Sequence, residues 1–254
     1  MVASFTPRQI TDIIQFQPST RWLTFEGNLA AQPGQFVMAW LPGVDEAPFS
    51  IASMDPFGLL VVDVGPFSHA LHQLTVGDRV WFKGPLGKGF VLDGKKHLLV
   101  GGGYGAAPLL PLATLARTGG SDVHLCLGAQ TEVGLLLIDQ FKDLGCKVSL
   151  TTEDGSLGAR GLVTDIIDSI LLQEKFDALY ACGPVGLLTV LVGLARTHRL
   201  PYQLSWEAHM RCGMGLCGSC EVPNEYDPAL PPGWLACFDG PVFANLNNYD
   251  ESGS

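Results

Sequence analysis

Four cysteines gather near the end of the chain, where their thiols could act together. The stretch that holds them is MRCGMGLCGSCEVPNEYDPALPPGWLACFDGPVF, and the thiols belong to Cys212, Cys217, Cys220 and Cys237. Their spacing is C-x4-C-x2-C, followed by sixteen residues before the last cysteine. Such a group could form disulfides, bind a single metal ion or hold an iron-sulfur cluster.

The spacing favours a 2Fe-2S cluster over the other possibilities. Plant-type clusters take three thiolates from one loop and a fourth from a distant position. Gly213, Gly215 and Gly218 lie between the cysteines, and glycines let backbone N–H groups approach the cluster sulfurs. A four-cysteine zinc site is the alternative, although such sites usually combine two separated cysteine pairs. Disulfides are least favoured, because seven cysteines is an odd number and we find no secretory signal.

A glycine-rich run could bind a dinucleotide. LLVGGGYGAAPLLPLA places Gly102, Gly103 and Gly105 between a strand and a helix that the pattern predicts. Glycines there let the backbone approach a pyrophosphate, whose charge is favoured at a helix N-terminus. The spacing differs from G-x-G-x-x-G, and packing is the alternative reason for such glycines. The position carries the prediction, because this is the first strand-helix turn of an α/β segment.

A second turn of the same segment could face a nicotinamide ring. The run YACGP contains Cys182, Gly183 and Pro184 and ends the last clear parallel strand. Ligands bind beyond the carboxyl ends of such strands, and a small side chain leaves room for the ring. The alternative is a buried packing cysteine, which is also our interpretation of Cys126 and Cys146.

Two serine motifs occur earlier in the chain, in APFSIAS and GPFSHAL. Ser50 at a strand end could donate a hydrogen bond to a planar heterocycle. The Gly65-x-x-Ser68 pattern at a helix start could bind phosphate through backbone N–H groups. Each serine taken alone could equally be a turn residue. Their position ahead of the dinucleotide segment favours a cofactor-binding β-domain.

The elements around these motifs change character along the chain. Residues 1–95 contain strand-like runs (RWLTFEGN, QFVMAWL, FSIAS, GLLVVDV, DRVWFKGP), turns (QPGQ, LPGVDEAP, DPFG, TVGD) and one helical run, SHALHQL. Many short strands indicate a barrel or a sandwich, and we expect an antiparallel β-barrel here.

From residue 96 strands alternate with helices. Strand-like runs (HLLVGGG, DVHLCLGAQ, KVSLTTEDG, FDALYACGP) alternate with helical ones (APLLPLATLARTG, LLLIDQFKDLG, GLVTDIIDSILLQE, VGLLTVLVGLARTHR). This order indicates βαβ units and a parallel sheet. We therefore predict a multidomain β plus α/β chain: a β-barrel over 1–95, a nucleotide-binding α/β domain over 96–200, and a small cluster domain over 201–254 that starts with a strand at YQLSWE.

Composition narrows the class of protein. The net charge is −10, with 15 basic and 25 acidic residues and no basic run, which argues against binding to nucleic acid or anionic membranes. The start, MVASFTPRQITDIIQF, has no apolar run behind a basic segment, and no window is apolar enough to span a membrane. We therefore expect a cytoplasmic protein with reduced thiols. No catalytic triad or carboxylate pair stands out, so the expected chemistry is that of cofactors alone.

These runs together resemble a known family along nearly the whole chain, the electron-transfer subunits of class B dihydroorotate dehydrogenase in the ferredoxin-NADP reductase superfamily. The resemblance rests on PFSIAS, GPFSHALHQLTVGDRVWFKGPLGKGF, LLVGGGYGAAPLLPLA, TTEDGSLGARGLVTD, YACGP and SWEAHMRCGMGLCGSC…CFDGPVF. The last of these is the most specific. Plain ferredoxins lack its Glu-x-x-Met before the first cysteine and its Asp-Gly-Pro-Val-Phe after the last.

The resemblance implies an FAD-binding barrel, an NAD-binding domain and a C-terminal 2Fe-2S domain. It implies a partner subunit that contains FMN and oxidises dihydroorotate in pyrimidine biosynthesis, in a heterotetramer of two subunits of each kind. Electrons would run from FMN through the cluster and FAD to NAD⁺. The implied cofactor-binding residues are Pro48, Phe49 and Ser50 with Gly65 and Ser68 for the flavin, Gly102, Gly103, Gly105, Gly183 and Pro184 with Cys182 for the nicotinamide dinucleotide, and the four cysteines for the cluster.

One position departs from the family pattern. The motif usually begins with an arginine that faces a flavin phosphate, and this chain has Ala47 there, preceded by two acids. The loss of a charge-assisted bond, about 1.5–3 kcal/mol, is expected to weaken flavin binding. NAD is expected over NADP, because no arginine cluster follows HLCLGAQTE to receive a 2′-phosphate.

Two other functions stay open on the sequence. The same modules could serve as the diaphorase part of a hydrogenase or sulfhydrogenase, or of a ferredoxin:NADP⁺ transhydrogenase. A zinc-stabilised module that has lost its flavin is the third possibility, and Ala47 is its only support. The Glu-x-x-Met sequence, Glu207 to Met210, favours the dihydroorotate dehydrogenase subunit.

Overall fold

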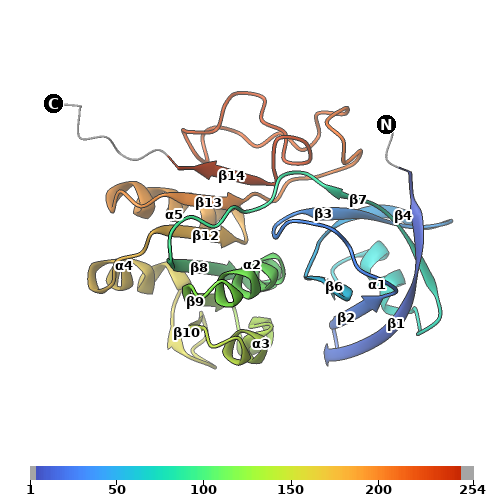
Figure 1. Ribbon diagram of the computed structural model, residues 1–254, viewed down its shortest axis with the longest axis horizontal. Helices are drawn as coiled ribbons and strands as arrows, with labels where there is room; N and C mark the ends of the chain where they lie inside the picture. The colour runs from blue at the N-terminus through green and yellow to red at the C-terminus, as the bar shows by residue number, and fades with distance from the viewer. Residues whose placement is uncertain (1–3, 247–254) are drawn as a thin grey trace.

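Two seven-stranded sheets organise the chain, one on each side of the view in Figure 1. The structure is a computed structural model and describes residues 4–246. The antiparallel sheet comes from the N-terminal part and the mixed sheet from the rest, which confirms the predicted succession of an all-β segment and an α/β segment. No helix among the described residues is long and apolar enough to cross a membrane.

The antiparallel sheet has the strand order β4-β3-β7-β1-β2-β6-β5. Its elements are β1 (Thr6–Gln17), β2 (Thr20–Phe25), β3 (Phe36–Leu41), β4 (Asp45–Ser50), β5 (Ser53–Met54), β6 (Phe57–Val62) and β7 (Arg79–Leu86), with the helix α1 (Pro66–His72) between the last two. Inward side chains of these strands form one apolar core. Within it Phe82 packs edge-on against Phe25 and Phe57, with ring centroids 4.8 and 5.1 Å apart.

Two local predictions fail in this sheet, and one strand was missed. The run LPGVDEAP was interpreted as a turn, yet its second half belongs to β4, which pairs with β3 from Leu41↔Asp45 to Phe36↔Ser50. The run FSIAS was expected to be one strand, but β4 ends at Ser50 and β5 begins at Ser53. The strand β1 was not expected at all. In each case the pairing partner, which is distant in the sequence or across a tight turn, overrides local preference.

The mixed sheet has the order β11-β10-β9-β8-β12-β13-β14 and is parallel except between its last two strands. Its strands are β8 (Lys96–Gly102), β9 (Asp122–Ala129), β10 (Lys147–Thr152), β11 (Ala159–Arg160), β12 (Ala178–Cys182), β13 (Tyr202–Ser205) and β14 (Val242–Asn245). The predicted strands of the α/β segment and the strand at YQLSWE are confirmed. Because β13 and β14 belong to this sheet, the sheet continues past residue 200, and the division into domains there stays a prediction.

Helices cover both faces of the mixed sheet. They are α2 (Ala106–Thr118), α3 (Ile138–Asp143), α4 (Val163–Gln173) and α5 (Val185–Thr197), with short 3-10 turns η1 (Gly103–Gly105) and η2 (Glu132–Gly134). The apolar sides of α2 and α3 pack in one core cluster and those of α4 and α5 in another. The predicted helices are therefore confirmed, and each places its apolar stripe on the sheet.

The strand order reverses beside β8. The chain runs from β8 outward to β9 and β10, and then returns to place β12 on the other side of β8. In open α/β sheets this reversal opens a crevice at the carboxyl ends of the two strands, where ligands bind. The turns at that point are η1, which follows β8, and Gly183-Pro184, which follow β12.

Residues 206–241 form irregular loops between β13 and β14. These residues form no helix or extended strand, and one isolated antiparallel bridge joins Glu221 to Leu235. Figure 1 shows these loops above the mixed sheet. Buried groups hold them down: the hydroxyl of Tyr202 on β13 donates to the fully buried carboxylate of Asp227, at 2.9–3.0 Å.

Candidate functional site

A cavity of about 440 Å³ lies between the two sheets. The antiparallel sheet lines it with β4, β6 and the start of α1, and the mixed sheet with η1, α2 and the end of β12. Its wall is mostly apolar, with Phe49 and Pro48 on one side and Pro108 on the other. A largely apolar cavity of this size suits a flat heterocycle.

The residues predicted to hold a flavin line this cavity. They are Pro48, Phe49, Ser50, Gly65 and Ser68, and Ala47 lies beside them. The lining contains no lysine or arginine among the described residues. Trp206 also lines the cavity, and its buried indole Nε1–H has no hydrogen-bond partner in the described part of the chain. This N–H is itself buried, so the cavity meets the ring of Trp206 and not its donor.

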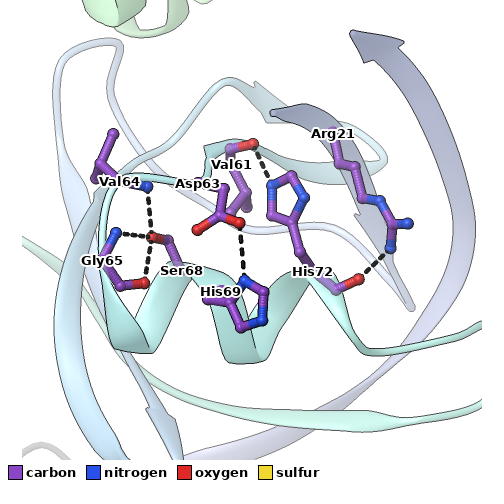
Figure 2. Close-up of polar contacts among 8 residues, drawn as sticks. All are labelled: Arg21, Val61, Asp63, Val64, Gly65, Ser68, His69 and His72. Atoms are coloured by element: carbon purple, nitrogen blue, oxygen red, sulfur yellow. Dashed lines mark hydrogen bonds and ion pairs between the residues drawn. The ribbon is translucent and has the colours of Figure 1, made fainter. Parts of the chain in front are cut away.

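The hydroxyl of Ser68 shapes the turn at the start of α1, as Figure 2 shows. It accepts hydrogen bonds from the backbone N–H groups of Val64 and Gly65, at 2.9 and 3.0 Å, and donates to the Gly65 carbonyl. These contacts occupy the hydroxyl within its own turn. Ser68 therefore sets the shape of the cavity wall, and its direct contact with a flavin stays a prediction.

Three further side chains fasten α1 to the sheet (Figure 2). His69 pairs with Asp63 through Nδ1, at 2.9 Å, and the ring of His72 lies 3.0 Å from the carbonyl oxygen of Val61. The guanidinium of Arg21 on β2 donates to the carbonyl of His72. Because the helix is fixed at both ends, the cavity wall that it forms is held in place.

Tyr104 and Glu207 meet at the mouth of this cavity. The Tyr104 hydroxyl donates to Glu207 Oε2 at 3.2 Å, and both residues line the cavity. Burial raises the pKa of the Glu207 carboxyl above its ordinary value, and the hydrogen bond from Tyr104 opposes that rise. Burial and the nearby Glu207 raise the pKa of Tyr104 to about 12. This contact was not predicted from the sequence. The available signal was that each residue is a polar side chain within or beside a cofactor motif, Tyr104 in GGGYG and Glu207 in SWEAHM.

A second cavity, of about 670 Å³, runs along the carboxyl ends of β8, β9 and β12. The predicted dinucleotide residues Gly102, Gly103 and Pro184 line it, and Tyr104 lines both cavities. The space around the α-carbon of Gly103 is open, so the backbone is accessible to a ligand. Of the residues along this groove that the structure describes, Glu153 is the only charged one. The groove therefore offers no cation to a phosphate on the ribose.

The remaining residues predicted to bind the dinucleotide, Gly105, Cys182 and Gly183, do not line this groove. Gly105 and Gly183 line neither cavity. A Cβ on Gly105 would lie 2.1 Å from the carbonyl oxygen of Cys182, so glycine lets the two turns meet. Cys182 is buried and lines the first cavity, and burial raises the pKa of its thiol to about 12. It is a neutral packing thiol that leaves room in the cavity.

The four cysteines of the C-terminal loops are surrounded by backbone donors. Cys212 Sγ accepts from the N–H groups of Met214 and Leu216, at 3.4 and 3.3 Å, and Cys237 Sγ accepts from Gly215 at 3.2 Å. The N–H of Cys237 points to Cys220 Sγ at 3.5 Å. N–H groups directed at sulfur stabilise negative charge there, as thiolate ligands require.

The thiols form two pairs. Cys212 lies beside Cys217, and Cys220 lies beside Cys237. The Ser219 hydroxyl and backbone, followed by the backbone of Cys212, lower the pKa of Cys217 to about 6. Burial raises the pKa of Cys237 to about 12, so this thiol would lose its proton only to a metal.

The donor set fits an iron-sulfur cluster better than a single ion. Within residues 4–246 no three His, Cys, Asp or Glu side chains are arranged around one point as a lone metal ion requires. Four thiols gathered from one stretch of loops would instead suit a cluster of several metal atoms. The loop glycines leave the space: Gly213, Gly215 and Gly218 adopt positive φ of 66°, 77° and 71°, which favours glycine.

Solved structures of flavin reductases are similar to this chain. The NADH-dependent reduced ferredoxin-NADP oxidoreductase, described for flavin-based electron bifurcation, is 30% identical with a TM-score of 0.82, over 96% of this chain and 90% of that one. A cytochrome P450 reductase from Amycolatopsis shares the fold at 23% identity and a TM-score of 0.67, over 78% of this chain and 68% of its own. The fold is that of flavin-dependent oxidoreductases of the ferredoxin-reductase kind.

Curated relatives and a family match narrow this class. The iron-sulfur cluster binding domain of dihydroorotate dehydrogenase B matches residues 207–245. The dihydroorotate dehydrogenase B (NAD(+)) electron transfer subunit of Methanocaldococcus jannaschii is 37% identical over 92% of this chain and 88% of the relative. Its namesake from Thermococcus kodakarensis is 40% identical over 86% and 87%. The chain belongs to the family of dihydroorotate dehydrogenase B electron transfer subunits.

Proposed function

We propose that this chain passes electrons between a partner dihydroorotate dehydrogenase subunit and NAD⁺, through an iron-sulfur cluster and a flavin. One observation carries the proposal. The first cavity is lined both by Tyr104, which also lines the dinucleotide groove, and by Met210, which lies two residues before Cys212. A flavin in this cavity would therefore border a hydride acceptor on one side and a one-electron carrier on the other, the exchange that flavins perform.

The cluster in this proposal is of the 2Fe-2S type, held by Cys212, Cys217, Cys220 and Cys237. The spacing of the cysteines and the division of their thiols into two pairs support this assignment. The chain supplies backbone N–H groups around the sulfurs, which stabilise the thiolates. The cluster, when bound, supplies one-electron chemistry that no side chain can perform.

The flavin in this proposal is FAD, and the antiparallel sheet is its barrel. Phe49 and Pro48 supply the apolar wall for the ring, and Ser50 supplies a hydroxyl near its edge. Ala47 leaves the usual cation out, and the Ser68 hydroxyl already accepts from the N–H groups of Val64 and Gly65, so few donors remain nearby for the phosphates. We expect flavin binding that is weaker than in relatives with arginine at this position.

The dinucleotide in this proposal is NAD. Gly102, Gly103 and Pro184 line its groove, and Gly105 and Gly183 let the two turns approach each other. Glu153 lines the groove, and in this proposal it accepts hydrogen bonds from ribose hydroxyls and repels a 2′-phosphate. The catalytic work belongs to the cofactors, with Cys182 as a packing residue on the nicotinamide side.

The partner in this proposal is an FMN-containing catalytic subunit, joined in a cytoplasmic heterotetramer of two subunits of each kind that serves pyrimidine biosynthesis. The name shared by the relatives, electron transfer subunit, supports a catalytic partner. Leu216 and Phe238 beside the cysteines are 80% and 63% exposed, which suits a surface that another subunit covers. The proposed units remain 1–95 for FAD, 96–200 for NAD and 201–254 for the cluster.

A second function is supported by one comparison. The NADH-dependent reduced ferredoxin-NADP oxidoreductase matches nearly the whole chain at 30% identity. The same modules would then serve a transhydrogenase or a hydrogenase instead of dihydroorotate oxidation. The curated relatives, at 34% to 41% identity, favour the dehydrogenase.

Anaerobic affinity purification of this chain from its native cells separates the two. The eluate is assayed for dihydroorotate-dependent NAD⁺ reduction, and the co-eluting protein is examined for FMN. Activity with an FMN protein is the expected result. A hydrogenase or a ferredoxin-linked partner in its place would leave the cofactor sites as argued and would overturn the substrate.

A further inference from the structure

A lysine of the antiparallel sheet reaches the cysteine loops. Lys83 lies on β7, and its side chain crosses to the segment that holds the thiols. Its ammonium group donates a hydrogen bond to the carbonyl oxygen of Cys212 at 3.0 Å, although the two residues are 129 positions apart. Lys83 is only 4% exposed, which is rare for a lysine.

The surroundings of Lys83 are apolar. Its ammonium lies 5.1 Å from the centre of the Phe5 ring, and its strand neighbour on β3 is Met38. The cysteine loop packs directly on this place: a Cβ on Gly213 would lie 2.8 Å from Met38 and 3.3 Å from Leu86. The positive charge is therefore enclosed between the sheet and the loop.

Within residues 4–246, no acidic side chain forms an ion pair with this charge. Among the ion pairs of the described residues none involves Lys83, whose only hydrogen bond there is the one to Cys212. A buried and unpaired ammonium is costly unless opposite charge is near. A cluster on four thiolates is negatively charged, and it gains one more negative charge when it accepts an electron.

We propose that Lys83 is a positioning residue that raises the reduction potential of the cluster: it fixes the Cys212 end of the loop and places a buried positive charge beside the reduced, more negative state. This inference rests on the proposed function, in that it takes the four cysteines to hold a two-iron cluster. A buried charge acts through a low dielectric and little salt, so its effect exceeds that of exposed cations.

The effect is directed at the cluster and not at the flavin. Lys83 is absent from the described lining of the flavin cavity, while its hydrogen bond ends on a cysteine. Arg211 precedes Cys212 directly, but it is exposed and its guanidinium reaches His209 at 3.2 Å. The chain thus offers a matched pair of cations beside the same cysteine, one buried and one in water.

The test is an EPR-monitored redox titration of the full chain, purified anaerobically with its cluster. Lys83→Met removes the charge and keeps the length, and Lys83→Arg keeps the charge. We expect a more negative midpoint potential in Lys83→Met, a smaller shift in the same direction in Arg211→Gln, and a potential near wild type in Lys83→Arg. Lys142→Met, on the distant helix α3, is expected to leave the potential unchanged.

Iron and sulfide content are measured on every variant, and Lys83→Gln serves as a second neutral replacement. A fully loaded Lys83→Met or Lys83→Gln protein with the wild-type potential overturns the inference. Neutral variants that hold no cluster at all also overturn it, because Lys83 would then serve assembly and not potential. Wild-type protein without the EPR signal of a two-iron cluster would instead overturn the proposed function itself.

Discussion

The two cavities and the cysteine loops are built in different ways. The cavity walls come from strand ends and turns that two hydrogen-bonded sheets hold in place. Residues 206–241 have no such ladder, and their order depends on Asp227, on buried apolar side chains and on N–H groups aimed at sulfur. Backbone pairing therefore shapes the cavities before any cofactor binds, whereas the cofactor itself is expected to complete the cysteine loops.

The sharpest test of this contrast removes one ligand. Cys217→Ser is expected to abolish the cluster and to lower electron transfer to the partner by about 100-fold or more, since even changes behind metal ligands cost about 10- to 100-fold. NADH oxidation with an artificial dye should persist, because the cavities lie in the sheets. Visible absorption, iron content and the two activities check this.

Cys146→Ser is the matched control, because this buried thiol lies in the core beside α3 and outside the loops. Its cluster content and electron transfer should match the wild type. Wild-type transfer to the partner in Cys217→Ser would break the assignment of the cysteines.

The next test changes a glycine at which the turns after β8 and β12 are in close contact. Gly105→Val places a side chain where a Cβ already meets the Cys182 carbonyl at 2.1 Å, so the turns after β8 and β12 must separate. We expect a loss of about 2–3 kcal/mol in the free energy of unfolding, as for overpacked cores, together with weaker NADH binding. Urea denaturation and NADH titration measure both.

Gly193→Ala is the comparison for that variant. This glycine lies within α5, and nothing stands within 4 Å of a Cβ added there. Alanine should raise the free energy of unfolding by about 0.5–1 kcal/mol, since it favours the helix. An equal loss of stability in both variants would contradict the proposed clash.

A smaller effect is expected from the carboxyl at the cavity mouth. The pKa of Glu207 is raised by burial, so its contribution to stability is full below its ordinary pKa of 4.5 and is lost as pH rises through the folded value. Glu207→Gln should therefore gain stability relative to the wild type as pH increases. Urea denaturation at a series of pH values gives this difference.

Tyr104→Phe sharpens the same test. The Tyr104 hydroxyl favours the ionised form of Glu207, so its removal should raise the pKa of Glu207 further and enlarge the loss of stability at neutral pH. A pH dependence identical in the wild type and both variants would show that the pair does not titrate as argued.

The smallest effect is expected at the amino-terminal ends of β8 and β10, at the end of the mixed sheet opposite to the groove. Glu174 pairs with Lys147 and with Lys96, the latter at 3.1 Å, and hydrogen bonds from these lysines lower its pKa to about 2. Its contribution is present above pH 4.5 and is lost as pH falls towards 2. Because Glu174 is near the surface, Glu174→Gln should cost no more than about 1 kcal/mol at neutral pH.

Glu174→Gln is also expected to leave NADH oxidation unchanged, because the pair lies away from both cavities. Acid denaturation compared with the wild type measures its contribution. A change in NADH oxidation would mean that this edge of the sheet communicates with the groove.

The sequence alone predicts the cysteine ligands and the α/β elements well, but it does not predict contacts between distant parts of the chain. The cysteine ligands were predictable because spacing along one loop carries the signal, and the α/β elements because their apolar periodicity is strong. The strand β4 was missed because Asp45 and Glu46 favour a turn until β3 pairs with them. The contact of Lys83 with Cys212 was missed for a similar reason, since it joins residues that only the fold brings together.

The side chains at the cavity mouth show the same limit. Tyr104 and Glu207 are 103 positions apart, and although each lies in a motif, neither motif indicates that their side chains meet. Ser68 was predicted from a pattern that the structure uses to cap its own turn. Local patterns thus predict which turns matter, while the atoms that face a ligand depend on how distant turns meet.

The pairing of β13 with β14 has a topological consequence. Their ladder ends at Ser205↔Val242, so the chain leaves the sheet and returns to it at adjacent positions. Residues 206–241 are therefore an insertion into what is otherwise a β-hairpin, and a tight turn could bridge the same two strands. The cysteine loops therefore have the topology of a separable insertion. A reductase could gain, lose or exchange them without any change in the strand order of the sheet.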